Sequence, residues 1–314
     1  MDAAIFLEEY AKLKNAVPRV ALINTKSENS AYTQYSISNR NVYICWGCEE
    51  NEDSYYGYWL YTNKDAVDSS FAYNTEITYE CVDVRRSYNI YYSQDLSDCR
   101  DMFLCLDCVG SSDCFGCVGL RQKQFQIFNV QYEKEDYHRE VARLRDEWSD
   151  EERRRLIREN FLQLKEKTPH IYMHQINAEH CTGDYIYNSR NCIWSFDIRN
   201  CEDSQYIYNT FDIKDCQDCS YVKDGQLMYE CVSAFGQNFN YCYVCWGGAN
   251  LDFCELCFNC QDMIGCIGLR NKRFCILNKQ YTEEEYRRVT SELKKNLCLA
   301  GIYQGKLPQI FWDG

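Results

Sequence analysis

Only 3 prolines and 4 histidines occur among the 314 residues, and no apolar run reaches the length of a membrane span. A transmembrane helix needs about 20 consecutive, mostly apolar residues, so none is expected. The first ten residues lack both the basic segment and the apolar segment of a secretory signal peptide. These absences predict a cytoplasmic or virion-associated protein with no membrane partner.

The motifs of common enzymes are also missing from the sequence. It contains no GxSxG, no HExxH and no glycine-rich phosphate loop. The formal net charge is −13, and an acidic chain repels the phosphate backbone of nucleic acids. We therefore expect no nucleic-acid partner. The sequence identifies no small-molecule substrate, and no cofactor is favoured, with zinc as the alternative.

Cysteine and tyrosine are abundant, with 22 and 27 copies. Disordered segments are poor in aromatic residues, so an ordered chain is expected. Cysteines without a secretion signal indicate a reducing compartment, where free thiols or metal sites are commoner than disulfides.

The chain is a tandem duplication. The pattern GLRxKxFxIxNxQY stands at the end of residues 114–132 and again at the end of residues 263–281. A charged helical segment follows each copy. Residues 191–232 align with residues 41–82 at a constant shift of 150, and the shift is 149 after a one-residue deletion. A repeat of this length is a whole structural body rather than a short motif.

The duplication and the helical periodicity divide the chain into five segments. The apolar face of the first helix is expected to cover the open end of the first repeat body. Ser149 with Glu152 and Thr282 with Glu285 are predicted capping boxes that start helices. The expected segments are a capping helix at 1–16, a repeat body at 17–132, a helical cap and linker at 133–167, a repeat body at 168–281, and a capping helix with a tail at 282–314.

Both bodies contain short aromatic and β-branched runs separated by Asn, Asp, Ser and Gly, which is typical of short strands and turns. A solenoid, a sandwich and a barrel all fit this pattern. We favour a mainly β fold with helical caps, in the form of a tandem-duplicated Cys/Tyr-rich β-solenoid that resembles a β-helix, because small residues recur beside its cysteines. The cysteine spacing is irregular, so no strict short repeat is expected.

Two interpretations of the cysteines compete, namely zinc ligation and packing of small buried side chains. The aligned halves discriminate between them, because a zinc ligand that becomes Ile or Leu loses the metal, whereas an interior position tolerates the change. Packing is favoured for seven aligned pairs: Cys45/Ser195, Cys48/Ile198, Ala66/Cys216, Ser69/Cys219, Ser93/Cys242, Leu96/Cys245 and Cys114/Met263.

Four aligned positions are cysteine in both halves and are the best candidates if zinc is bound. They are Cys81, Cys105, Cys108 and Cys117 in the first half, and Cys231, Cys254, Cys257 and Cys266 in the second. A second, weaker metal candidate is the cluster of His170, His174, His180 and Cys181, which has no counterpart in the first half.

Acidic pairs at Asp65/Asp68 and Asp215/Asp218 repeat between the halves. They support the hypothesis of a β-helical carbohydrate-active enzyme, although Asp is also a preferred turn residue. The favoured interpretation is turn chemistry.

Basic residues of the repeated motif and the apolar tail are the candidates for binding a protein partner. They are Arg121, Lys123, Arg270, Lys272, Arg273, Phe311 and Trp312. Pairing of the basic side chains with the acidic bodies is the alternative interpretation.

The Pro-Arg-Val-Ala-Leu-Ile segment from Pro18, the Tyr-Glu-Cys-Val steps and both GLRxKxFxIxNxQY motifs resemble a family of uncharacterised cysteine-rich proteins. The family is common in metagenomic candidate-phyla bacteria, and the resemblance covers about residues 17–290. Its members often carry an N-terminal zinc-ribbon region, which is not found in this sequence. The resemblance therefore implies a fold and no activity.

The favoured function is a non-enzymatic structural or interaction protein that binds protein partners or assembles with itself, as a virion subunit does. A zinc-binding interaction module and a carbohydrate-active enzyme are the two alternatives.

Overall fold

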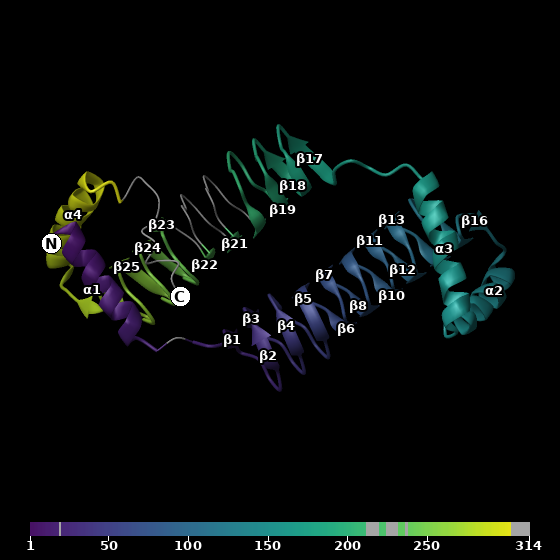
Figure 1. Cartoon of the computed structure of the whole chain (residues 1–314), viewed down its shortest axis with the longest axis horizontal. Coiled ribbons are helices and arrows are strands. Elements are labelled where there is room, and N and C mark those ends of the chain that lie inside the picture. The colour runs from purple at the N-terminus through teal and green to yellow at the C-terminus, as the bar shows by residue number, and fades with distance from the viewer. Residues whose placement is uncertain (19, 212–219, 224–231, 236–237, 303–314) are drawn as a thin grey trace. The chain divides into compact units, whose positions relative to one another are not determined.

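The computed structural model is mainly β, and its described residues form four helices and several sheets. It describes residues 1–18, 20–211, 220–223, 232–235 and 238–302. The chain divides into two compact bodies (Figure 1). Body 1 is Val20–His170, and body 2 combines Met1–Arg19 with Ile171–Gly314.

Body 1 is built from short parallel strands, each paired with the strand twelve residues away. Tyr88, for example, lies opposite both Glu76 and Arg100. The same register joins successive parallel strands through most of the body (Figure 1). The strands are β1 Asn24–Thr25, β2 Ala31–Gln34, β3 Ser36–Ile37, β4 Tyr43–Trp46, β5 Tyr55–Tyr61, β6 Lys64–Val67, β7 Ser70–Tyr73, β8 Glu76–Tyr79, β9 Val82–Arg85, β10 Tyr88–Tyr91, β11 Gln94–Ser97, β12 Arg100–Phe103, β13 Leu106–Val109, β14 Ser112–Phe115, β15 Gln124–Ile127 and β16 Val130–Gln131.

A three-residue period underlies the twelve-residue register. Every third residue from Lys26 to Phe128 has a left-handed backbone, with φ between 45° and 72°. From Thr33 to Leu120, the residue after each left-handed one points inward and is buried. The expectation that no strict short repeat is present is therefore wrong, because the irregularly spaced cysteines occupy only some positions of a strict three-residue period.

Inward side chains also provide hydrogen-bond partners for the inward backbone. The N–H of Asn51 donates to Asn39 Oδ1 at 2.9 Å, and the N–H of Cys99 donates to Ser87 Oγ at 3.1 Å. Asn39 Nδ2 donates to the Cys48 carbonyl, nine residues on, at 2.8 Å. A buried polar group without a partner costs about 1–3 kcal/mol, which explains why this interior holds Asn, Ser and Cys beside Leu and Val.

Charged residues alternate in sign on one outward column of body 1. Glu28 lies opposite Arg40, Arg40 opposite Glu52, and Glu52 opposite Lys64. Opposite charges on paired strands are favourable and like charges are unfavourable, so a slip by one twelve-residue step would bring like charges together. The column therefore helps to set the register.

The repeated motif ends the parallel series with a hairpin in each body. Phe128 and Asn129 both have positive φ, and they turn β15 back onto β16, which is antiparallel. Asn129 also bonds both backbone groups of Val118, with Oδ1 accepting at 2.9 Å and Nδ2 donating at 2.7 Å. Gly116 is required beneath this hairpin, because a Cβ there would lie 2.5 Å from the Phe128 ring.

Two helices cover this end of body 1, namely α2 Lys134–Glu147 and α3 Glu151–Lys167 (Figure 1). Tyr137, Val141 and Leu144 of α2 pack with Phe103 and Phe115. The N-cap of α3 is Asp150, whose side chain accepts from the Arg153 N–H at 2.9 Å. The predicted capping box at Ser149 and Glu152 is wrong by one residue, because Asp is an equally good cap.

Body 2 repeats the parallel arrangement, with the same register of twelve after a first pair offset by eleven. Its last strand also turns back antiparallel, at Leu277 and Asn278. The strands are β17 Gln175–Glu179, β18 Gly183–Arg190, β19 Ser195–Arg199, β20 Tyr208–Phe211, β21 Ser220–Lys223, β22 Val232–Phe235, β23 Phe239–Asn240, β24 Gly248–Asp252, β25 Cys260–Ile264, β26 Arg273–Ile276 and β27 Lys279–Gln280.

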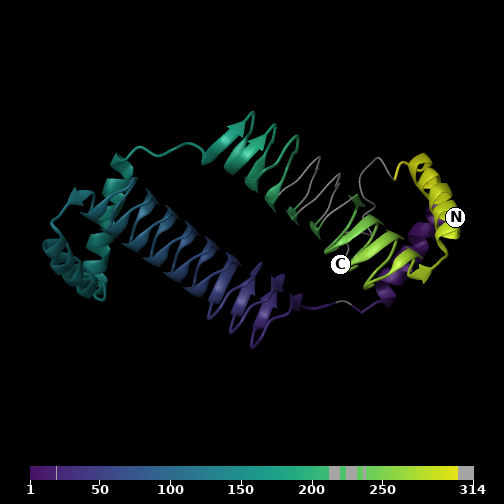
Figure 2. The same ribbon diagram turned by 180° about the vertical axis from the view of Figure 1, so that it is seen from behind.

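The N-terminal helix α1 Ala3–Ala16 packs on body 2, beside the C-terminal helix α4 Glu283–Leu299 (Figure 2). Phe6 is fully buried against Phe253, and the Tyr10 hydroxyl donates to Glu255 Oε1 at 2.8 Å. The expectation that this helix covers the first body is therefore wrong.

The predicted capping box of Thr282 with Glu285 is confirmed at the start of α4. Among the described residues, no helix is both long enough and apolar enough to span a bilayer.

Candidate functional site

The interior cysteines are the most numerous chemically reactive groups. Most of the described cysteines are buried free thiols. Inward thiols donate to carbonyls, as Cys99 Sγ does to the Cys108 carbonyl nine residues on, at 3.3 Å. This is the bond that Asn39 makes in the same column, so the thiol acts as a small hydrogen-bonding core group. Cys45 and Cys48 form a disulfide, which corrects the expectation of free thiols at these two positions.

The candidate zinc ligands of body 1 are all buried, but they do not converge. Cys81, Cys105 and Cys117 share one inward column, and Ser93 separates Cys81 from Cys105. Two steps between strands span about 10 Å, whereas zinc–sulfur bonds are about 2.3 Å long. Cys81 is thus too far away to share one ion with the others.

Body 2 buries its corresponding cysteines, Cys254, Cys257 and Cys266, in the same way, and Cys231 lies outside the described residues. Throughout the described part of the chain, no three His, Cys, Asp or Glu side chains are placed to hold a metal ion. Burial raises the pKa of Cys81 to about 11 and that of Cys99 to about 11, because desolvation disfavours the thiolate. A neutral Cys81 thiol is a poor metal ligand and a poor nucleophile, whereas hydrogen bonds with neighbouring thiols lower the pKa of Cys117 and Cys257.

The aligned pairs that mix cysteine with other residues occupy interior positions. Wherever the structure describes their side chains, both members are buried, as packing predicts. Cys216 and Cys219 lie outside the described residues.

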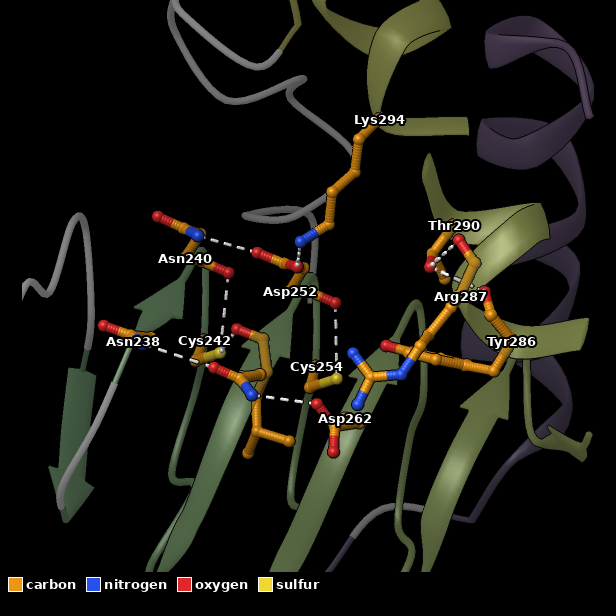
Figure 3. Close-up of polar contacts among 12 residues, drawn as sticks. Asn238, Asn240, Cys242, Asp252, Cys254, Asp262, Tyr286, Arg287, Thr290 and Lys294 are labelled. Atoms are coloured by element: carbon orange, nitrogen blue, oxygen red, sulfur yellow. Dashed lines mark hydrogen bonds and ion pairs between the residues drawn. The ribbon is translucent and has the colours of Figure 1, made fainter. Parts of the chain in front are cut away.

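An open groove of about 450 Å³ lies between β23–β25 and α4 in body 2 (Figure 3). At its centre Asp252 is only 2% exposed. Asp252 Oδ1 accepts from Asn240 Nδ2 at 2.7 Å, and Oδ2 pairs with Lys294 Nζ at 2.5 Å. Both carboxylate oxygens are therefore engaged, and the pair anchors α4 to β24 rather than offering a free general base.

Three further polar side chains of this groove form a second ladder. Asn238 donates to Asn250 Oδ1 at 3.3 Å, and Asn250 donates to Asp262 Oδ1 at 2.8 Å (Figure 3). Asp252 aligns with the apolar Phe103 of body 1, so this polar centre is not repeated in the other half. Sequence analysis missed Asp252 and Lys294, because only the fold brings α4 next to β24.

A shallower groove of about 700 Å³ runs along body 1 beside the alternating charge column. Arg86 contacts Asp98 through two bonds of 2.7 Å, and the guanidinium lowers the pKa of that carboxyl. Arg100 lies over the Tyr88 ring at 5.3 Å. These charged side chains contact one another across neighbouring strands. They therefore help to set the strand register rather than form a substrate site.

The histidines of the candidate metal cluster contact different residues. His170 Nε2 contacts the Lys165 carbonyl at 2.8 Å, whereas His174 Nδ1 contacts Asp184 Oδ1 at 3.1 Å and stacks on Tyr185. His180 lies near Glu179. Each histidine thus has a contact of its own, and the part of the chain that the structure describes contains no group of three His, Cys, Asp or Glu side chains that could hold a metal ion.

The acidic pair Asp65 and Asp68 occupies two exposed left-handed positions, with φ of 53° and 50°. Asp tolerates this backbone better than most residues, in agreement with turn chemistry. Asp215 and Asp218 lie outside the described residues.

The basic candidates are exposed on the closing motif of each body. Arg121 binds Asp107, with Nη2 to Oδ1 at 2.7 Å, and Arg270 lies over the Phe258 ring at 5.0 Å. Lys123, Lys272 and Arg273 are exposed to solvent. Phe311 and Trp312 lie outside the described residues.

No family model and no curated protein matches the chain. Among solved structures, it is similar to the crystal structure of a "putative acetyltransferase" from Desulfovibrio desulfuricans G20. The identity is 9%, the match covers 96% of this chain and 93% of that chain, and the TM-score is 0.15. A TM-score this low carries no argument about fold or activity.

Proposed function

We propose that this chain is a non-enzymatic structural or interaction protein, a subunit of a larger assembly such as a virion, built from two β-solenoid bodies. In each body, one rung of the solenoid is twelve residues with four left-handed corners. The register of twelve and the inward residue at every third position support this arrangement. The proposed locations are the cytoplasm or the virion.

The use of the polar groups supports a scaffold over an enzyme. The buried Asn, Ser and Cys side chains bond the backbone of the next rung. In the two grooves, the Asp98 carboxylate bonds Arg86, twelve residues back, and the Asp252 carboxylate bonds Asn240 and Lys294 of α4. A catalytic acid or base must instead reach the reacting group of a substrate.

Native mass spectrometry of the protein, purified under reducing conditions, tests the proposal. We expect a metal-free multimer or a complex with a co-purifying protein. A monomer that carries one or two zinc ions would instead support the metal-binding module and return attention to Cys105, Cys108 and Cys117. Turnover of a polysaccharide that is lost in Asp65→Asn, with the fold retained, would support the carbohydrate-active enzyme.

A further inference from the structure

Exposed apolar side chains are concentrated on one face of the first three rungs of body 1. This aromatic face consists of the outward residues of β2, β4 and the first half of β5. None of its nine outward residues is charged, although 26% of the chain is. Its members, with exposed fractions between 36% and 67%, are Tyr32, Tyr43, Ile44, Trp46, Tyr55, Tyr56 and Tyr58.

Body 2 exposes apolar side chains at the aligned positions. Ile193 replaces Tyr43 and Trp194 replaces Ile44, at 40% and 63% exposure. The other members of this counterpart face are Phe196, aligned with Trp46, and Tyr206, aligned with Tyr56, at 41% and 57% exposure. The residue types differ between the halves, yet these four positions stay large, apolar and exposed, whereas Gln205 replaces Tyr55. Such a pattern fits a surface that contacts another molecule.

Further along each body, helices of the same chain pack on the continuation of this face. In body 1 its continuation carries Tyr91, Phe103 and Phe115, and α2 and α3 pack over them. In body 2 its continuation carries Tyr241 and Phe253, and α1 and α4 pack over them. The first three rungs have no such cover among the residues that the structure describes. The face thus carries large apolar side chains at both ends of the body, and helices cover only the later rungs.

We propose that a second copy of this chain occupies the aromatic face and its counterpart, an inference that rests on the proposed assembly function. Rings repeat once per rung, about 4.8 Å apart, so two copies present the same spacing to one another. Tyr and Trp also dominate the energetically important centres of protein interfaces, where charged residues are depleted.

The exposed area agrees with self-association. At about 200 Å² for each large side chain, the aromatic face leaves roughly 600 Å² open and its counterpart roughly 400 Å². A stable interface needs about 800 Å² per partner. One face alone gives weak, concentration-dependent pairing, whereas the two faces of each chain together exceed the requirement.

Sedimentation velocity of the full chain over a range of concentrations tests the inference. We expect concentration-dependent association, and we expect Trp46→Glu with Phe196→Glu to raise the dissociation constant at least ~10-fold. The matched controls are Val109→Glu and Ile176→Glu, at 38% and 59% exposure in columns outside the two faces, and they should associate like the wild type. Circular dichroism checks that each variant is folded.

A photo-crosslinking residue at position 56 provides a second readout without charge insertion. It should join two copies of the chain, whereas the same residue at position 109 should not. Association that survives the Trp46/Phe196 variant and leaves position 56 uncrosslinked would overturn this interface while the assembly function stands. A monomeric wild type would overturn it too, as would binding of the face to lipid vesicles or soluble polysaccharide instead. Failure of the assembly function itself would appear separately, as bound zinc or as catalytic turnover.

Discussion

At the scale of single residues, the interior of this protein is a polar lattice as much as an apolar core. Asn39, Asn51 and Asn63 form one inward column in which each amide bonds the backbone of the next rung. Ser87 and Cys99 continue the same column with shorter side chains. Cysteine is therefore one member of a set of small hydrogen-bonding residues, which explains its exchange with Ser between the halves, whereas its exchange with Ile and Leu follows from burial alone.

The Asn51 side chain is predicted to contribute strongly to stability. Its Oδ1 accepts from the Asn63 N–H at 3.0 Å, and its Nδ2 donates to the Leu60 carbonyl at 2.7 Å. Asn51→Ala leaves both groups buried without this partner, so we expect a loss of about 2–4 kcal/mol in urea unfolding. Asn51→Ser retains an acceptor of the kind found at Ser87 and should lose about half as much. Equal losses in the two variants would contradict the role of the lattice.

The buried thiols predict a loss of stability at alkaline pH. Burial raises the pKa of Cys81 to about 11, above its usual value near 9. The unfolded chain therefore releases the Cys81 proton at lower pH than the folded chain does. The stability that the protonated thiol contributes is complete below pH 9 and is lost as the pH rises towards 11. We expect the free energy of unfolding to fall by about 2–3 kcal/mol over this range because of this thiol. Cys81→Val should have a shallower pH dependence in urea unfolding between pH 9 and 11, and an unchanged slope would contradict the assignment.

At the scale of elements, each body ends in a hairpin that faces amphipathic helices. The parallel series cannot continue past Asn129 or Asn278, because both side chains occupy the backbone groups of the preceding rung. In body 1 the helices follow directly in sequence. In body 2 one of them, α1, comes from the other end of the chain and joins Tyr10 to a residue 245 positions away.

Glu255 is predicted to hold α1 on body 2. Its Oε1 accepts from the Tyr10 hydroxyl at 2.8 Å and pairs with Lys14 Nζ at 3.1 Å, and the Lys14 side chain is only 7% exposed. Glu255→Gln leaves the buried ammonium without its counter-charge, so we expect a loss of about 3 kcal/mol. Hydrogen exchange of the α1 amides should accelerate correspondingly.

Glu9→Gln is the matched control for this change, because Glu9 pairs with Lys12 on the exposed side of α1. A surface pair of this kind contributes under about 1 kcal/mol. Unchanged exchange of α1 in Glu255→Gln, or equal acceleration in both variants, would show that the apolar contacts of Phe6 alone position the helix.

The capping elements illustrate what the sequence could predict. Thr282 with Glu285 is a local signal, and the structure confirms it. The site of α1 packing was not predictable from helical periodicity, since an apolar stripe does not specify which body it covers. The three-residue period was also missed, because the inward positions hold polar Asn and Ser as well as apolar residues such as Val84, so no hydropathy pattern marks them. The shared face of Tyr43 and Ile193 becomes visible only once the register of twelve is known.

At the scale of the whole molecule, the register of twelve makes each rung depend mainly on its two neighbours. Stability in such an arrangement is approximately a sum of rung and neighbour contributions. The alternating charges and the inward lattice both connect residues twelve apart. The number of rungs is therefore less constrained than the twelve-residue register between them.

Excision of one complete rung tests this dependence. Deletion of residues 76–87 places Tyr88 opposite Lys64 and Cys99 above Thr75, so every column retains its phase. Deletion of residues 76–84 removes nine residues, which preserves the three-residue period but moves every later side chain into the wrong column. We expect the first variant to fold, with circular dichroism like the wild type and a melting temperature lowered by about 5 °C. The second should lose cooperative unfolding of body 1. If both variants fold equally well, the triplet alone determines the structure, and the columns of paired charges and inward amides contribute little to it.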